Sequence, residues 1–137
     1  MEANANQSIV LLIEDETDHD TPTRKLIEQI GATCYRVTSV ESAEEILDQN
    51  APDVVIVDYD LPDGTGIDLI ALLRQNTNHR GTPIILLTGE IDPHELERAV
   101  MMGIYAFLAK PFNHDEFTKL VNAAILEEAN RVKNSEE

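Results

Sequence analysis

The sequence predicts an α/β fold built on a parallel β-sheet. Short apolar runs alternate with segments that repeat apolar residues at helical spacing, an alternation typical of strand–helix–strand units. Four of the five runs are apolar throughout, as in strands that helices cover on both faces. The five runs are Ile9–Ile13, Thr33–Val37, Val54–Val57, Ile84–Leu87 and Ala106–Ala109.

The runs differ in ways that suggest their places in the sheet. Val54–Val57 has only β-branched apolar residues, which favours the central position. Thr33–Val37 is more polar and is better suited to an edge. The stretch Asp60–Gly66, with its proline and glycines, predicts a turn-rich loop.

Helix signals occupy the segments between the runs. Thr21 and Asp92 each precede a proline, which indicates a cap followed by a first turn. Ser39 and Asn113 are further candidate caps. In the fourth helix we expect Leu96, Ala99 and Val100 to face the core. The last helix carries its apolar residues at helical spacing, at Phe117, Leu120, Val121, Ala124 and Ile125.

The length of 137 residues fits one domain. We expect a flexible lead-in over residues 1–8, one domain over 9–130 and a charged tail over 131–137. Within the segment Glu127–Glu137 we expect the chain to fray into solvent.

Composition narrows the class of partner. The 26 acidic against 10 basic residues give a net charge of −16, which disfavours direct binding to nucleic acid or an anionic membrane. Cys34, the single cysteine, excludes an internal disulfide and is expected to be a buried, inert thiol. Without a membrane-length apolar stretch or a signal-peptide pattern, we expect a cytoplasmic protein.

Chemically active residues follow the apolar runs. Because the carboxyl ends of parallel strands meet at one edge of a sheet, these residues should converge. Clustered carboxylates repel one another unless a cation joins them, and hard oxygen ligands suit Mg²⁺ or Mn²⁺. The residues are Glu14, Asp15, Glu16, Asp58, Thr88 and Lys110.

Asp58 is the strongest candidate among these residues. Lys110 supports it, because a lysine ending an apolar strand is costly unless it meets an anion such as Asp58. Asp58 alone could be a solvated loop acid. The bond between Lys110 and Pro111 is a candidate cis peptide. The histidines do not cluster, and we expect all four to be solvated: His19, His79, His94 and His114.

Together these residues resemble the receiver domain of two-component response regulators, over Ser8 to Asn130. The resemblance implies a flavodoxin-like, doubly wound, five-stranded parallel sheet of order 2-1-3-4-5 with five helices. The segments that carry it are Leu11–Asp15, Val57–Gly66, Leu86–Gly89 and Leu108–Phe112.

The resemblance also implies roles for individual residues. Asp58 would be the phosphoacceptor, and Thr88 and Lys110 would bind phosphoryl oxygens. Phe107 would be a switch aromatic that turns inward when Thr88 moves towards the phosphate. The ligands of Mg²⁺ would be Glu14, Asp15 as the direct carboxylate, Asp58, and the backbone carbonyl of Asp60.

The implied function is a phosphorylation-dependent signalling switch that catalyses only its own phosphoryl transfer and dephosphorylation. The donor would be a sensor histidine kinase or a histidine phosphotransfer protein. A downstream protein would bind the face formed by the fourth helix, fifth strand and fifth helix. The expected exposed contacts are Glu95, Arg98, Tyr105 and Lys119.

Three positions depart from the commonest pattern of that family. Glu14 stands in place of the usual first aspartate, Gly89 in place of alanine or serine, and Phe107 in place of tyrosine. Two alternatives remain open. One is a haloacid-dehalogenase-like phosphohydrolase that uses Asp58 and Asp60. The other is a pseudo-receiver that binds its partner without phosphorylation.

Overall fold

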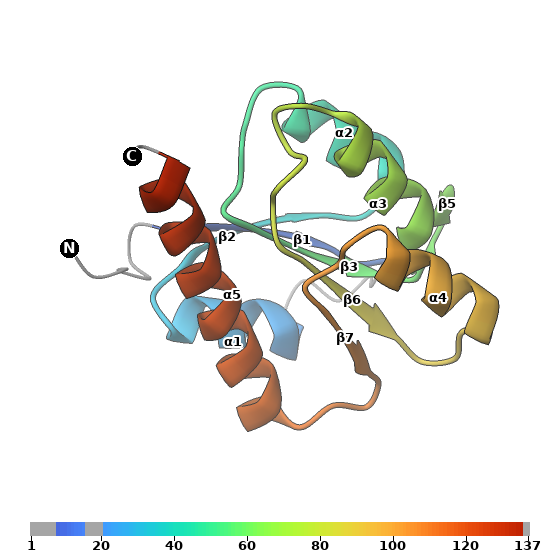
Figure 1. Cartoon of the computed structure of the whole chain (residues 1–137). Coiled ribbons are helices and arrows are strands. Elements are labelled where there is room, and N and C mark those ends of the chain that lie inside the picture. The colour runs from blue at the N-terminus through green and yellow to red at the C-terminus, as the bar shows by residue number, and fades with distance from the viewer. Residues whose placement is uncertain (1–7, 16–20, 136–137) are drawn as a thin grey trace.

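The computed structural model describes residues 8–15 and 21–135. A central sheet lies between two layers of helices, with α1 and α5 on one face and α2, α3 and α4 on the other (Figure 1). This arrangement confirms the predicted doubly wound α/β fold.

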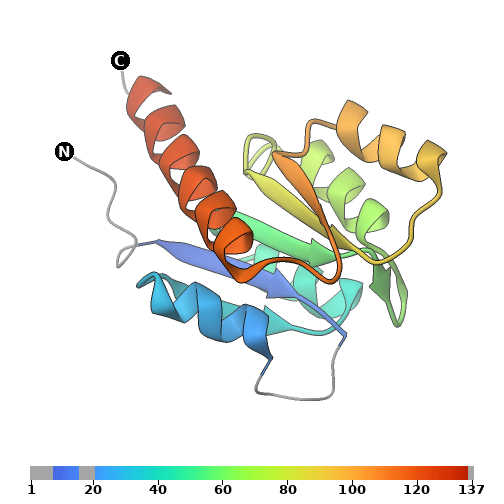
Figure 2. The ribbon, with the colours of Figure 1, turned by 90° about the horizontal axis from the view of Figure 1, so that it is seen from below.

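The sheet has five parallel strands in the order β2-β1-β3-β6-β7. Counted as long strands alone, this is the predicted order 2-1-3-4-5, with the β3 strand central and the β2 strand at an edge. The arrows of neighbouring strands point the same way in Figure 2. The bounds are β1 Ile9–Ile13, β2 Thr33–Val37, β3 Val54–Asp58, β6 Ile84–Thr88 and β7 Ala106–Ala109.

The predicted caps begin their helices. Thr21 Oγ1 accepts a hydrogen bond from the Arg24 amide at 3.4 Å, and Asp92 Oδ1 accepts one from the His94 amide at 2.7 Å. Ser39 and Ser42 form a reciprocal capping box. The helices are α1 Pro22–Gln29, α2 Val40–Leu47, α3 Gly66–Gln75, α4 Pro93–Met101 and α5 His114–Ser135.

Side chains of alternate strand residues enter two separate cores. One core lies under α1 and α5 and includes Val10, Ile56 and Phe117. Cys34 belongs to it, which confirms the predicted burial, and that burial raises the pKa of its thiol to about 12. The other core lies under α2, α3 and α4 and includes Leu11.

Three details differ from the sequence prediction. The loop after β3 contains a small antiparallel ladder, between β4 Asp60–Leu61 and β5 Gly64–Thr65. In α4, Ala99 is buried but Val100 is 55% exposed, because its position on the helix turns it away from the sheet.

The third difference is the length of α5, which continues to Ser135 where fraying was expected. Glu128 is buried, and its carboxylate pairs with Arg131 Nε at 2.6 Å. The Arg131 guanidinium also lies against Gly81. These contacts hold the charged segment on the domain. None of the described helices combines the length and apolarity that a membrane span requires.

Arg74 connects three segments at the amino edge of the sheet, which is the edge where the strands begin. Its guanidinium donates hydrogen bonds to four backbone carbonyls, those of Met102 at 2.8 Å, Gly103 at 2.9 Å, Thr82 at 3.0 Å and His79 at 3.4 Å. Arg74 therefore ties the end of α3 to the loop before β6 and to the end of α4. Sequence analysis did not single out this residue.

Candidate functional site

The carboxyl edge of the sheet brings the predicted residues together. Asp58 ends β3, Thr88 ends the adjacent β6, and Lys110 directly follows β7. Gly66, the first residue of α3, packs directly against the backbone of Asp58 at this edge. A Cβ atom on Gly66 would lie 2.6 Å from the carbonyl oxygen of Asp58, so any side chain there would displace the strand end.

Asp58 and Lys110 form an ion pair. Lys110 Nζ lies 2.8 Å from Asp58 Oδ1, although the angles are not those of an aligned hydrogen bond. The Asp58 side chain is 7% exposed and that of Lys110 is 35% exposed. The prediction that Lys110 meets an anion is confirmed, and the bond from Lys110 to Pro111 is cis.

Thr88 brings a hydroxyl group that has no hydrogen-bond partner within the described part of the chain. The residue is 4% exposed, so water does not readily replace the missing partner. A buried polar group without a partner carries a desolvation cost. A ligand oxygen bound beside Asp58 could accept this hydrogen bond.

Glu14 lies at the same edge but turns towards the edge strand β2. Its Oε2 atom accepts hydrogen bonds from Thr21 Oγ1 at 2.7 Å and from Arg36 Nε at 2.9 Å. Sequence analysis missed Thr21 and Arg36 in this role. The only available signal was an arginine within an edge strand beside an acidic strand end.

The acidic side chains are less crowded than the sequence suggested. Within residues 8–15 and 21–135, no three His, Cys, Asp or Glu side chains form a group that could hold a metal by themselves. The carboxylates are separated because Glu14 is hydrogen-bonded to Arg36 and the side chain of Asp15 is exposed to solvent. Glu16 lies outside the described residues.

The donor chemistry nevertheless fits a hard divalent cation. Asp15, Asp58 and the backbone of Asp60 offer oxygen atoms at one strand edge, without nitrogen or sulfur ligands. Mg²⁺ is bound by one or two carboxylates and keeps several waters, so it does not need a complete protein cage.

Phe107 lies beside Thr88, at the rim of a surface hollow. The ring is 47% exposed, and the hollow is also lined by Tyr59, Gly89 and Ala109. The aromatic side chain therefore points outwards next to the unpaired Thr88 hydroxyl.

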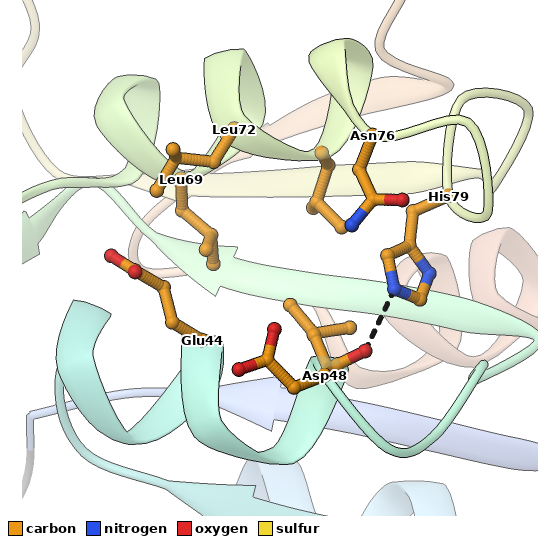
Figure 3. A pocket seen from close by; sticks show the side chains of 8 residues that line it. Glu44, Asp48, Leu69, Leu72, Asn76 and His79 are labelled. Atoms are coloured by element: carbon orange, nitrogen blue, oxygen red, sulfur yellow. Dashed lines mark hydrogen bonds between the residues drawn. The ribbon is translucent and has the colours of Figure 1, made fainter.

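His79 contradicts the prediction of a solvated side chain. It is 3% exposed and closes one end of a pocket between α2 and α3 (Figure 3). Its Nε2 atom lies 2.9 Å from the carbonyl oxygen of Leu47, so Nε2 carries the hydrogen. The polar loop folds back over the helix ends, which the loop composition does not reveal. His94 and His114 are exposed as predicted, and His19 lies outside the described residues.

Comparison with known proteins identifies the family. The model of the response regulator receiver domain matches residues 10–122. The two-component response regulator ORR3 of Oryza sativa subsp. indica is 28% identical over 121 residues, which are 85% of this chain and 90% of ORR3.

Solved structures agree with that match. The non-phosphorylated HemR receiver domain from Leptospira biflexa has a TM-score of 0.78 at 28% identity, over 87% of this chain and 94% of that one. The receiver domain of sensor histidine kinase PA1611 from Pseudomonas aeruginosa PAO1, described with magnesium coordinated in its active-site cleft, has a TM-score of 0.76 at 25% identity, over 86% and 97% of the two chains. The matched family model, the sheet order and the residues at the carboxyl edge lead to one conclusion: this chain belongs to the response regulator receiver domain family.

Proposed function

We propose that this chain is a phosphorylation-dependent switch that accepts a phosphoryl group on Asp58. The ion pair between Asp58 and Lys110, beside the unpaired Thr88 hydroxyl, is the observation that carries the proposal. It supplies an acceptor carboxylate, a cation and a hydrogen-bond donor at one strand edge. Receiver domains are signalling domains in two-component systems and are generally not enzymes.

The donor in this proposal is a phosphohistidine of a sensor histidine kinase or a histidine phosphotransfer protein. A carboxylate oxygen of Asp58 attacks the phosphorus, the phosphorus–nitrogen bond breaks, and the imidazole leaves with the electron pair of that bond. Burial keeps Asp58 in one orientation, which lowers the entropic part of the barrier.

Lys110 and Thr88 stabilise the charge that the transfer brings into the site. Lys110 already lies within ion-pair distance of Asp58, and its ammonium can pair with a phosphoryl oxygen instead. The Thr88 hydroxyl gains the acceptor that it lacks. Both groups are held by strand ends, so little reorganisation is needed during the reaction.

A bound Mg²⁺ would neutralise charge between the carboxylates and the incoming phosphoryl group. Asp15, Asp58 and the carbonyl of Asp60 are the proposed ligands. Glu14 would contribute from its remaining carboxylate oxygen, through water. One relative, the PA1611 receiver domain, is described with magnesium in its active-site cleft.

The proposed output surface is the face formed by α4, β7 and α5. Phe107 connects it to the site, because its strand β7 pairs with β6, which ends at Thr88. When Thr88 turns towards a phosphoryl oxygen, the Phe107 ring can move into the vacated space. Of the residues on these elements, Tyr105, Met101, Arg98 and Lys119 are exposed, whereas Glu95 is only partly exposed.

The two alternatives have less support. The phosphohydrolase hypothesis uses the same segment that matches the receiver family model, and the strand with Asp58 is the third along the chain. The pseudo-receiver hypothesis does not account for an acceptor, a lysine and a hydroxyl assembled at one edge.

Labelling with acetyl phosphate and Mg²⁺ tests the proposal. The wild-type protein should gain one phosphoryl group, detected by intact-mass spectrometry. Asp58→Asn should abolish the label, and Asp115→Asn, which changes an exposed acid of α5, should keep it. Equal labelling of wild type and Asp58→Asn would exclude Asp58 as the acceptor. A receiver should show no turnover of an aryl phosphate, whereas a phosphohydrolase should.

A further inference from the structure

Arg36 and Glu14 form a buried ion pair beside the candidate site. Arg36 Nε lies 2.9 Å from Glu14 Oε2, and the two side chains are 6% and 2% exposed. Thr21 Oγ1 donates to the same carboxylate oxygen at 2.7 Å. The pair is therefore fixed in place and shielded from water, unlike the surface pair between Arg24 and Glu28.

The pair is close to the site in the sheet. Ile13 is in register with Val57, and the next residues along the two strands are Glu14 and Asp58. Neighbouring strands lie about 5 Å apart. On the other side of β1, Leu12 is in register with Arg36. The positive charge of Arg36 is thus two strands away from Asp58.

We infer that Arg36 is a built-in counter-cation that competes with a divalent metal for the charge of Glu14 and so weakens metal binding at this site. The inference rests on the proposed function, since it concerns the metal that phosphoryl transfer requires. It assigns Arg36 a tuning role, not a catalytic one.

The effect is electrostatic: the positive charge of Arg36 repels the metal and so offsets the attraction that Glu14 exerts on it. A unit charge and a divalent cation about 10 Å apart, at an effective dielectric constant of about 20, change a binding constant by more than about a hundredfold without salt, and by roughly tenfold when physiological salt screens them. Salt weakens that effect less for a buried charge than for an exposed one.

Calorimetric titration with MgCl₂ tests the inference. Arg36→Gln keeps an amide donor near Glu14 but removes the charge, and its Kd for Mg²⁺ should be about tenfold lower than that of the wild type. Its melting temperature should also rise more on addition of Mg²⁺. An unchanged Kd, or a higher one, would refute the inference.

Arg24→Gln is the matched control. Arg24 lies in the same region as Arg36, since both arginines are near Cys34. Burial raises the pKa of the Cys34 thiol, and the charges of the two arginines lower it. Arg24 forms an ion pair with the exposed Glu28. Removing its charge should change the Mg²⁺ affinity by less than about twofold, because exposed charges are screened. An equal gain in both variants would show a general charge effect and would overturn a specific role for Arg36.

Two further variants cover the case in which Arg36→Gln does not fold. Arg36→Lys keeps the charge and should bind Mg²⁺ like the wild type. Arg36→Met keeps the aliphatic stem without the charge and should bind Mg²⁺ about tenfold more tightly than the wild type. An Arg36→Met protein that binds no more tightly than Arg36→Lys would contradict the charge competition. Absence of Mg²⁺ binding by the wild type would instead count against the proposed function.

Discussion

The two edges of the sheet differ in how their polar groups are satisfied. At the amino edge, side chains donate hydrogen bonds to backbone carbonyls: Arg74 donates to four of them, and His79 donates to the carbonyl of Leu47. At the carboxyl edge, the Thr88 hydroxyl has no partner among the described residues. The ammonium of Lys110 there is partly open to solvent.

The amino edge of the sheet thus contributes mainly to stability, and the carboxyl edge mainly to function. Buried polar groups that have partners hold the loops of the amino edge together, apart from His79 Nδ1, which has none in the described chain. Polar groups that lack partners, at the carboxyl edge, are available to a ligand and cost stability until one binds. Substitutions at the amino edge should therefore lower the stability and leave phosphorylation intact. Substitutions at the carboxyl edge should impair the response to phosphorylation without lowering the stability.

The largest expected effect is at the amino edge. Arg74→Met keeps the aliphatic stem but removes the donors to four carbonyls, and should cost about 4 kcal/mol of unfolding free energy, at roughly 1 kcal/mol for each hydrogen bond. Urea unfolding measures the loss. Arg80→Met, which changes an exposed arginine, should be neutral within about 0.5 kcal/mol. Folded Arg74→Met should still be labelled by acetyl phosphate. A loss of labelling would show that the amino edge also contributes to phosphorylation.

A smaller effect of opposite sign is expected at the carboxyl edge. Thr88→Val removes a buried hydroxyl without a partner, and should stabilise the unphosphorylated protein by about 1 kcal/mol. Thr21→Val, by contrast, removes a hydroxyl that has partners and should cost about 1 kcal/mol.

The same Thr88→Val variant should lose the response to beryllofluoride. In amide spectra, the shifts at Phe107 and Tyr105 should disappear, whereas the Mg²⁺ response of Asp15 should persist. A destabilised Thr88→Val protein would show that the hydroxyl already has a partner in solution.

The smallest effect concerns pH and the turn between β4 and β5, at the carboxyl edge. The carboxylate of Asp63 accepts hydrogen bonds from the amides of Glu41 at 3.0 Å and Val40 at 2.8 Å, which lower its pKa. A lowered folded-state pKa means that this stabilisation is present above the pKa of the unfolded chain. It is lost as the pH falls through the folded-state value. Asp63→Asn should flatten this part of the acid side of the stability curve, and an unchanged slope would contradict the assignment.

The residues that sequence analysis found share a simple geometric rule. Asp58, Thr88 and Lys110 lie at or just after strand ends, and a parallel sheet brings strand ends to one edge whatever path the loops take. Five apolar runs were therefore enough to predict both the fold and the position of these three residues.

The residues that it missed depend on loop paths. Arg74 reaches carbonyls 28 and 29 residues away, and His79 reaches a carbonyl 32 residues away. A backbone carbonyl has no sequence signature, so these contacts could not be predicted. Arg36 was missed for a related reason, since its acidic partner was already assigned to a metal. The length of α5 was missed because composition does not show that Glu128 is buried.

The contact behind Asp58 has a consequence for how finely the acceptor can be adjusted. At Gly66 the space available is that of one hydrogen atom, because a methyl group would lie 2.6 Å from the main-chain oxygen of the acceptor and 3.0 Å from Leu86 Cδ1. Helix α3 is thus a mechanical stop for the end of β3. A single methyl group at that stop would move the nucleophile without changing any charge, so the position offers a purely steric means of changing the transfer rate.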